Sequence, residues 1–186
     1  LYVKELGIDY ASCSAHKIYG PKGVGAAYLK GDDYGIQPIT AFMHGGEQEF
    51  GFRAGTLAVH NIVGFGKAAE IALRDMGKNE KHIKKLDKKL VSELAAIPYI
   101  RLTVESGSRL PGIVSIVIEK ENFNNERFLK EISDCIALSS GSACSAGKPS
   151  YVISALGLKD QMSKVLRISL NKYTATQDIE RLVEVL

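Results

Sequence analysis

Cysteine is scarce in this sequence, and its few copies lie far apart. The 186 residues include three: Cys13, Cys135 and Cys144. They are too few and too scattered for a disulfide scaffold, and none forms the C-x-x-C pair of a zinc site. An odd count of cysteines without a signal sequence indicates a reducing cytoplasm, where a thiol stays free to react.

Long hydrophobic runs are also missing. No apolar stretch approaches the ~20 residues that a membrane helix needs, and no signal-peptide pattern opens the chain. Leu1 begins inside what reads as structure, without an initiator methionine, so we expect a fragment or a missing start. A hydrophobic content of 45% with 24% charged residues is ordinary for a globular protein and is enough to build a core.

Positive charge is in small excess, with a formal net charge of +3. Much of the excess lies in one lysine-rich segment that also contains Glu80 and Asp87: Lys78, Lys81, Lys84, Lys85, Lys88 and Lys89. No aromatic residues alternate with these lysines to stack on bases, so we expect a solvated helix face and no nucleic-acid partner. His44, His60 and His82 lack the spacing of a metal site, and His82 is expected to be solvated on the lysine-rich face.

The first third of the chain predicts two strands and an irregular loop. Residues 8–12 and 23–29 have the pattern of short buried strands around a turn at Gly20-Pro21. Residues 43–56 are polar and rich in glycine, which predicts a long loop; loops of this length are usually functional or disordered.

A helical stripe follows and predicts a long helix that bridges two lobes. Gly77 interrupts the stripe near its middle, and Pro98 stops it. Its apolar residues recur at helical spacing: Ile62, Phe65, Ala69, Ala72, Met76, Ile83, Leu86, Leu90 and Leu94.

The remaining residues alternate between strand and helix patterns and predict a small α/β lobe. The middle expected strand is apolar on both faces, as in a covered sheet. Asn124 and Ser150 are suited to cap the two expected helices, and Thr174 with Gln177 predicts a capping box for the terminal helix. The pattern predicts strands at 101–104, 113–118 and 165–170, and helices at 124–134 and 150–157.

The first motif with residues suited to catalysis is Ser14-Ala15-His16-Lys17-Ile18-Tyr19-Gly20-Pro21-Lys22-Gly23. A lysine amine that attacks a carbonyl group must lose its proton, although a free lysine titrates near ~10.4. A tight turn after a strand fixes the Lys17 amine and restricts its water, which favours the neutral nucleophile. Ser14 and His16 lie beside it as donors for a phosphate. From the residues alone, a surface lysine is the alternative.

These ten residues resemble the lysine motif of class V aminotransferase-like enzymes, and most closely that of the cysteine desulfurases. In that family the lysine carries pyridoxal 5'-phosphate, and the flanking serine and histidine bind its phosphate. The resemblance therefore assigns cofactor attachment to Lys17 and phosphate binding to Ser14 and His16.

The second motif is the glycine-rich run from His44 to Thr56. Glycines let the backbone approach a ligand closely and expose N–H groups to anions. The run resembles the family's loop across a dimer interface, in which the last threonine donates to a cofactor phosphate; the resemblance assigns this role to Thr56. Glu47 stands where glycine is usual and Phe50 where arginine is usual, which leaves the loop geometry and the dimer contact open.

The third motif is the run of small residues around Cys144, Ser139-Ser140-Gly141-Ser142-Ala143-Cys144-Ser145-Ala146-Gly147-Lys148. A thiol in a wet loop near Lys148 reaches its thiolate more easily than a buried one. An exposed cysteine in a serine-rich turn is the alternative. Cys13 and Cys135 lie beside or within apolar patterns, where cysteine acts as a small hydrophobe. The run resembles NifS/IscS-type desulfurases, whose catalytic cysteine lies on an extended loop; this implies catalysis by Cys144.

The fourth candidate is Arg167, an arginine inside the last apolar strand. Its burial is expensive unless an anion meets its guanidinium, and a bidentate pair with a carboxylate suits an amino-acid substrate. An internal salt bridge at the strand end is the alternative. The position is similar to the family's arginine for the substrate carboxylate, and this similarity assigns substrate binding to Arg167.

Because the resemblance covers nearly the whole chain, it implies a fold and a reaction. The fold is α/β, the C-terminal part of a PLP-dependent transferase of fold type I. It comprises the tail of the large cofactor-binding domain at 1–60, a connecting helix at 61–96 and a small domain with the cysteine loop at 97–186. The reaction converts L-cysteine to L-alanine in a homodimer and leaves a persulfide on Cys144 for an acceptor protein such as an iron–sulfur scaffold.

Further cofactor ligands of the family, including the aspartate that pairs with the pyridine nitrogen, come from an N-terminal half that these residues do not include. We therefore expect the chain alone to bind the cofactor poorly and to turn over little or nothing. Two alternatives remain: a non-catalytic remnant that dimerises or docks sulfur-transfer partners, and a related activity such as selenocysteine lyase or a class V aminotransferase.

Overall fold

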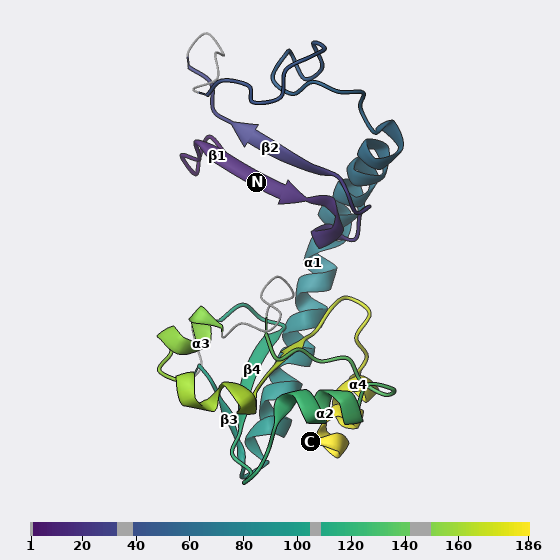
Figure 1. Ribbon diagram of the computed structural model, residues 1–186. Coiled ribbons are helices and arrows are strands. Elements are labelled where there is room, and N and C mark those ends of the chain that lie inside the picture. Colours follow the sequence, from purple (N-terminus) through teal and green to yellow (C-terminus); the bar gives the residue numbers. More distant parts are fainter. Residues whose placement is uncertain (1, 33–38, 105–108, 142–149) are drawn as a thin grey trace. The chain divides into compact units, whose positions relative to one another are not determined.

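The computed structural model describes residues 2–32, 39–104, 109–141 and 150–186 (Figure 1). The chain divides into two compact units, the N-terminal unit Leu1–Met76 and the C-terminal unit Gly77–Leu186. The division falls inside the longest helix, α1 (Val59–Ala95), so this helix contributes residues to both units. Among the described helices, none is both long and apolar enough to cross a membrane.

A two-stranded antiparallel sheet forms the centre of the N-terminal unit. It pairs β1 (Tyr10–Ser14) with β2 (Gly25–Leu29), so that Ser14 lies opposite Gly25. Both strands begin two residues later than the sequence pattern predicts. The reason for β1 is local: the Ile8 N–H donates to the Val3 carbonyl oxygen at 3.0 Å and is therefore held in a turn.

The glycine-rich run 43–56 contains no helix or strand, as predicted. A single parallel bridge joins Met43 to Arg53, and the Ala54 N–H donates to the Met43 carbonyl oxygen at 3.4 Å. Between these ends, Glu49 and Phe50 have φ angles of 54° and 57°, in the left-handed region that is uncommon for residues other than glycine. The run is thus a closed loop with a constrained tip.

Helix α1 is uninterrupted from Val59 to Ala95, so the interruption of the apolar stripe at Gly77 does not break the helix. A glycine inside a helix costs about 1 kcal/mol relative to alanine, which a helix of 37 residues can tolerate. The expected buried stripe is correct only in part. Leu86, Leu90 and Leu94 are buried, whereas Ile62 and Met76 are 41% and 61% exposed.

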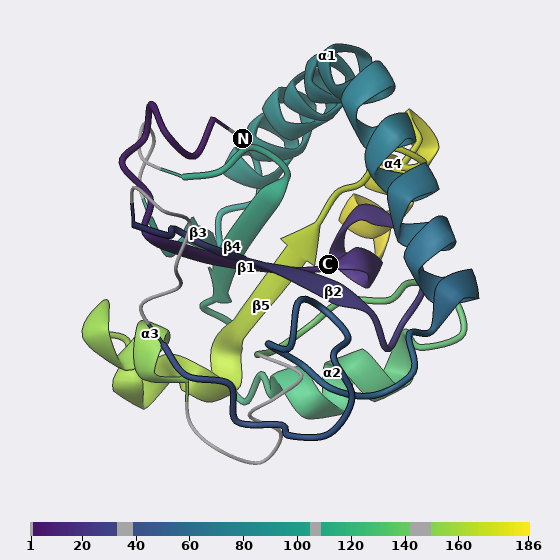
Figure 2. The ribbon, with the colours of Figure 1, turned by 90° about the horizontal axis from the view of Figure 1, so that it is seen from above.

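A three-stranded antiparallel sheet organises the C-terminal unit, in the order β3 (Ile100–Leu102), β4 (Ile113–Ile118), β5 (Val165–Ser169). Figure 2 shows β4 beside β5. Strand β4 is covered on both faces, as its sequence predicts, because successive side chains of a strand point to opposite sides. One face joins the leucines of α1 and α4 (Thr176–Val185) in the main core: Leu86, Leu90, Leu94, Val114, Ile116, Ile118, Leu166, Ile168, Ile179, Leu182 and Leu186. The other face carries a smaller cluster: Val117, Ile153, Leu158 and Val165.

Two short helices flank this sheet, and both begin at the predicted caps. The Asn124 side chain accepts from the Arg127 N–H at 3.0 Å and starts α2 (Asn125–Glu131). The Ser150 hydroxyl accepts from the Ile153 N–H at 3.4 Å and starts α3 (Tyr151–Ala155). Both helices end before the predicted residues. A 3-10 helix, Lys159–Lys164, leads into β5.

The predicted capping box of the terminal helix is wrong. Helix α4 is capped at Ala175, whose N–H donates to the Asp178 carboxylate at 2.8 Å. The Thr174 hydroxyl instead accepts from the Asn171 N–H in the preceding turn. The sequence offered an oxygen-bearing side chain at Thr174, but the turn from Asn171 uses that oxygen.

Three other expectations about polar residues are also wrong. His82 is not solvated: it is half-buried, and its Nε2 donates to the Thr174 carbonyl oxygen at 2.9 Å. Asp87 belongs to the buried interior and not to the solvated lysine face. Cys13 and Cys135 are exposed, so neither acts as a small core residue in these units.

Candidate functional site

The Lys17 turn is built directly onto the end of β1. A 3-10 helix, Ala15–Ile18, follows the strand, and Ala15 is fully buried at its start. The Ala15 N–H donates to the Val24 carbonyl oxygen at 3.1 Å, and the Ala15 carbonyl oxygen accepts from the Gly20 N–H at 2.9 Å. These two bonds anchor the turn, so that Ser14, His16 and Lys17 are presented together as exposed side chains.

Small residues hold this turn against the first turns of α1, within the N-terminal unit. A Cβ atom at Gly64 of α1 would lie 2.7 Å from Pro21 Cγ, and one at Gly20 would lie 3.1 Å from Ala68 Cβ. Larger residues at either position would push the lysine turn away from the helix. The glycines of the Gly20-Pro21 turn and of α1 therefore position the Lys17 turn through close packing.

The turn suits pyridoxal phosphate by the chemistry of its donors. Ser14 occupies the N-cap position of the 3-10 helix, yet its side chain makes no capping hydrogen bond, so its hydroxyl is available to a ligand. Lys17 forms no ion pair with any residue that the structure describes. A free hydroxyl, an imidazole and an amine within four residues match a phosphate and an aldehyde carbon. The expected restriction of water at Lys17 is absent in this unit, because the lysine is exposed.

Gln48 closes the loop that ends at Thr56, a role that the motif analysis missed. Its side-chain oxygen accepts from the Gly55 N–H at 3.0 Å. Gly46 lies directly against the same amide, since a Cβ atom there would be 2.5 Å from Gln48 Oε1. Gln48 thus fixes the backbone immediately before Thr56, which is exposed. The sequence signal for such a closure is a glutamine within a glycine-rich run, because glycine N–H groups are accessible to its side-chain oxygen.

Arg167 lies in β5, with Ser115 of β4 as its register partner. It is half-buried, and one of its guanidinium nitrogens donates to the Ser139 hydroxyl at 3.1 Å. It forms no ion pair with any residue in the described ranges. The alternative of an internal salt bridge therefore has no support in the described part of the chain, and the guanidinium retains donors for an anion.

Ser139 joins Arg167 to the segment that leads to Cys144. The two residues exchange backbone hydrogen bonds of 2.6 and 3.2 Å, which adds Ser139 to the free edge of β5. The Ser139 hydroxyl also donates to the Gly141 carbonyl oxygen at 2.7 Å. Cys144 itself lies outside the described residues. The sequence motif included Ser139 but gave no sign of this pairing, because 28 residues separate the two partners.

A partly buried ion pair elsewhere in the C-terminal unit has a structural role. Asp87 and Arg109 form two hydrogen bonds of 2.6 Å, and the Gly112 N–H donates to Asp87 at 2.7 Å. Burial raises the pKa of Asp87, but the Arg109 hydrogen bonds, the Gly112 N–H and the Arg109 charge outweigh it, so this pKa is below its ordinary value.

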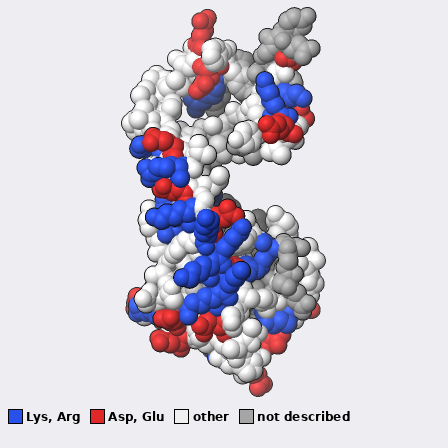
Figure 3. Space-filling view, turned by 180° about the vertical axis from the view of Figure 1, so that it is seen from behind, with Lys and Arg blue, Asp and Glu red and all other residues white. Residues whose placement is uncertain are grey.

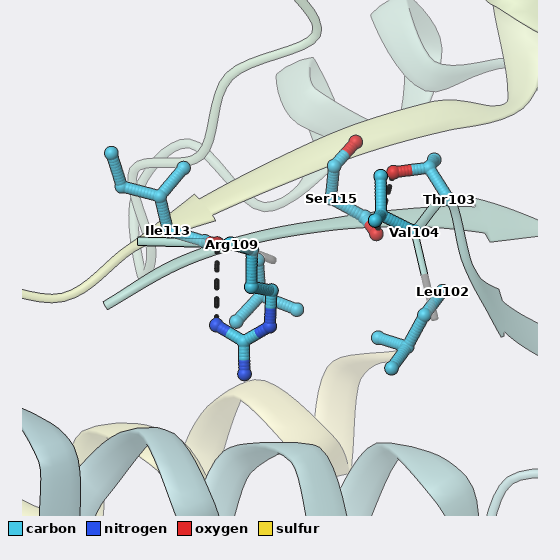
Figure 4. Close-up of a pocket in the computed structure, with 7 residues that line it drawn as sticks. Leu102, Thr103, Val104, Arg109, Ile113 and Ser115 are labelled. Atoms are coloured by element: carbon cyan, nitrogen blue, oxygen red, sulfur yellow. Dashed lines mark hydrogen bonds between the residues drawn. The ribbon is translucent and has the colours of Figure 1, made fainter. Parts of the chain in front are cut away.

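Figure 4 shows the Arg109 guanidinium turned toward the helices below the sheet, with a 3.4 Å bond to the Ile113 carbonyl oxygen. The cavity beside it, lined by Leu102 and Ser115 among others, holds about 60 Å³. That is room for a few water molecules only, so this cavity is not a cofactor site.

The four motifs thus fall into two groups. Ser14, His16 and Lys17 share one turn of the N-terminal unit, and Thr56 follows a closed loop in the same unit. Arg167 lies in the C-terminal unit beside the segment that leads to Cys144. The roles assigned to these residues stay predictions.

Sequence comparison finds desulfurases among the relatives. The chain is 41% identical to the probable mitochondrial cysteine desulfurase of Schizosaccharomyces pombe, over 98% of the chain and 36% of that protein. It is 39% identical to the cysteine desulfurase IscS of Pseudoalteromonas translucida, over 99% of the chain and 45% of that protein. The chain therefore spans less than half the length of these relatives.

Structure comparison gives the same result and confirms the expected fold. A NifS-like protein from Rickettsia africae matches with a TM-score of 0.84 and 31% identity, over 98% of this chain and 48% of its own. Another NifS-like protein matches with a TM-score of 0.82 and 33% identity, over 98% of this chain and 46% of its own. The model of the aminotransferase class-V family matches residues 1–182. The chain therefore belongs to the class V aminotransferase family, and the relatives named above are cysteine desulfurases and NifS-like proteins within it.

Proposed function

We propose that this chain forms the C-terminal part of a pyridoxal-phosphate-dependent cysteine desulfurase, which converts L-cysteine to L-alanine. One observation carries the proposal. A half-buried guanidinium, Arg167, has no acidic partner among the described residues and is paired through Ser139 with the segment that leads to Cys144. A substrate carboxylate held by Arg167 then presents the substrate sulfur to the thiol of that segment.

The N-terminal unit supplies the cofactor-binding groups. Lys17 would hold pyridoxal phosphate through its amine, and Ser14 and His16 would donate to the phosphate. Thr56 would donate to a phosphate across a dimer interface, from the loop that Gln48 closes. When bound, the cofactor supplies an electron sink for electrons released at the substrate Cα. The Lys17 amine moves the proton at that Cα, for which it must be neutral.

Cys144 receives the sulfur. Its thiolate attacks the sulfur of L-cysteine, an S–S bond forms, and the substrate Cβ–S bond breaks. The carbon skeleton takes up a proton at Cβ and leaves as L-alanine, so that the sulfur atom remains on Cys144 as a persulfide. No external oxidant or reductant is required, because the atoms of L-cysteine and the thiol equal those of L-alanine and the persulfide.

The wider setting belongs to the same proposal. A persulfide needs an acceptor, such as an iron–sulfur scaffold protein or an enzyme of thionucleoside synthesis. A reducing compartment such as the cytoplasm would keep the Cys144 thiol free. The assignment of Thr56 requires a homodimer. Cofactor attachment to Lys17 and sulfur transfer to Cys144 are two parts of this proposal that can be measured separately.

The experiment uses the natural gene product at its own length, loaded with pyridoxal phosphate and given L-cysteine. We expect visible absorbance from the bound cofactor, release of alanine, and a mass increase of one sulfur atom on the peptide that contains Cys144. Lys17→Ala should remove the absorbance. Cys144→Ser should abolish the persulfide, whereas Cys135→Ser, which changes another exposed thiol, should retain it.

Arg167→Lys keeps the charge but loses the planar fork, and should raise KM for L-cysteine about tenfold or more while cofactor absorbance persists. Absence of cofactor absorbance in the wild type would identify a non-catalytic remnant. Cofactor absorbance and alanine release without a persulfide on Cys144 would indicate a related lyase or transaminase.

A further inference from the structure

The lysine-rich segment of α1 has no part in the chemistry proposed above. Four of its side chains, Lys81, Lys84, Lys85 and Lys88, surround a shallow hollow on the surface of the C-terminal unit. Figure 3 shows Lys and Arg side chains gathered on this side of the unit. Here a single helix presents several cationic groups to solvent at close spacing.

Some of these lysines are neutralised by neighbouring carboxylates. Lys84 pairs with Glu80 at 2.5 Å, and Lys89 pairs with Glu93 at 2.9 Å and with Glu180 at 3.3 Å. The remaining lysines of the segment form no ion pair with a residue that the structure describes: Lys78, Lys81, Lys85 and Lys88. We name these four residues the lysine stripe.

The lysine stripe has the geometry of one helix face. Its members fall at positions i, i+3, i+7 and i+10, so they share one side of α1 over about 15 Å. Like charges three and four residues apart repel one another and weaken a helix. An anionic surface of matching spacing would relieve this repulsion, and a row of carboxylates on a helix has the same spacing.

We propose that the lysine stripe docks an acidic helical face of a partner protein. Its limited length favours this occupant: Glu80 neutralises Lys84 beside it, and Glu93 and Glu180 end the cationic run at Lys89. Four lysine charges over about three turns match the length of a short acidic helix. A longer polyanion would extend over these carboxylates and be repelled by them. The stripe contains lysines, whose flexible point charges fit carboxylates without demanding one fixed geometry.

The surroundings of the stripe argue against a membrane or a nucleic acid. The apolar side of this part of α1, including Leu86 and Leu90, is buried in the core of the C-terminal unit, so it cannot insert into a lipid surface. No aromatic side chain lies among the lysines of the segment to stack on bases. The formal net charge of the chain is only +3, which gives a weak long-range field for a polymer of phosphates.

The test measures binding of the full 186-residue chain to a stapled helical peptide with glutamates at positions i, i+3, i+7 and i+10. Fluorescence anisotropy at low salt should detect binding. Lys81→Gln/Lys85→Gln/Lys88→Gln should weaken it about tenfold, as expected for three exposed ion pairs. The control Lys4→Gln/Lys130→Gln/Lys159→Gln removes the same charge from exposed lysines elsewhere and should leave binding within about twofold of the wild type.

A second peptide of the same composition, with its glutamates spread around the helix, separates spacing from net charge and should bind several-fold more weakly. Circular dichroism of both triple variants should match that of the wild type, since all six lysines are on the surface. The proposal fails if the two triple variants bind alike or if the two peptides bind alike. It also fails if a duplex RNA or an anionic vesicle competes more strongly than the acidic helix. Because the assay needs neither cofactor nor L-cysteine, its outcome is independent of the proposed desulfurase reaction.

Discussion

The two compact units differ in how many apolar side chains they bury. The C-terminal unit buries the leucines of α1 in one cluster with residues of its sheet and of α4, and Leu90, Ile116 and Leu166 are completely inaccessible. Among the described residues of the N-terminal unit, the buried apolar side chains are Ala15 and Ala68. Its large apolar residues are exposed instead, with Phe42 at 90% and Phe50 at 106%.

The C-terminal unit therefore has the larger source of stability within itself. Burying apolar area is the dominant favourable term in folding, and the C-terminal unit has a continuous buried cluster from helix to sheet to helix. The N-terminal unit retains its sheet hydrogen bonds and the packing of small residues around the Lys17 turn. The groups that we propose to bind the cofactor therefore lie on a scaffold with little core of its own, whereas Arg167 lies on a well-packed strand.

Replacing Asp87 with alanine should produce the largest loss of stability. Arg109 would remain as a partly buried charge without its partner, which costs about 3–5 kcal/mol in the free energy of unfolding. Urea unfolding of the full chain, followed by far-UV circular dichroism, measures the shift of the C-terminal unit. Asp134→Ala, at an exposed position, should change the free energy by less than about 0.5 kcal/mol. Equal urea midpoints for Asp87→Ala and the wild type would refute a structural role for the pair.

Two leucines on the same helix provide the most direct test of the contrast between the units. Leu90→Ala should cost about 2–5 kcal/mol, because Leu90 is 0% exposed and its removal leaves a cavity. Leu73→Ala should cost less than about 0.5 kcal/mol, because Leu73 is 75% exposed in the N-terminal unit. The helix, the residue type and the change are the same, so a comparable loss at both positions would mean that the N-terminal unit buries Leu73 in solution.

Acid should weaken the C-terminal unit through Asp87. The pKa of this carboxyl in the folded chain is below its unfolded value of about 3.9. Its contribution to the free energy of unfolding is therefore fully present above the unfolded pKa and is lost as the pH falls through the folded pKa. The loss should be smaller than in Asp87→Ala, because a protonated carboxyl still forms hydrogen bonds. Urea midpoints measured from about pH 6 downward should fall less steeply in Asp87→Asn than in the wild type. Parallel curves would assign the acid sensitivity to other groups.

The smallest effect on stability is expected from the exposed apolar residues of the N-terminal unit. Phe42→Ser/Met43→Ser/Phe50→Ser should change the free energy of unfolding by less than about 0.5 kcal/mol, because all three side chains are largely in solvent. The same variant should bind less of a hydrophobic dye such as ANS than the wild type does. Dye fluorescence that is unchanged in the triple variant would show that these side chains are covered in solution.

Local features were predictable because they depend on neighbouring residues. Asn124 and Ser150 cap their helices as expected. Among the predictions that depended on distant partners, the covering of β4 on both faces was correct, but two about polar residues were wrong. His82 lies in a lysine-rich sequence, yet it forms a hydrogen bond with Thr174, which is distant in the sequence. Asp87 is buried because Arg109 and Gly112 donate hydrogen bonds to it. The capping box failed for a local reason, the competing turn from Asn171.

The residues of the Lys17 turn could be identified from the sequence, since Ser14, His16, Lys17 and the Gly20-Pro21 turn are contiguous, but the packing of the turn against Gly64 and Ala68 of α1 could not. The sequence also supplied the small residues around Cys144 and the arginine of the last strand. Two features became visible in the folded chain alone: Ser139 pairs with Arg167 along the edge of β5, and four lysines of α1 have no acidic partner among the described residues. A sequence pattern records what each residue can do, whereas hydrogen bonds and ion pairs between distant residues depend on where the chain returns.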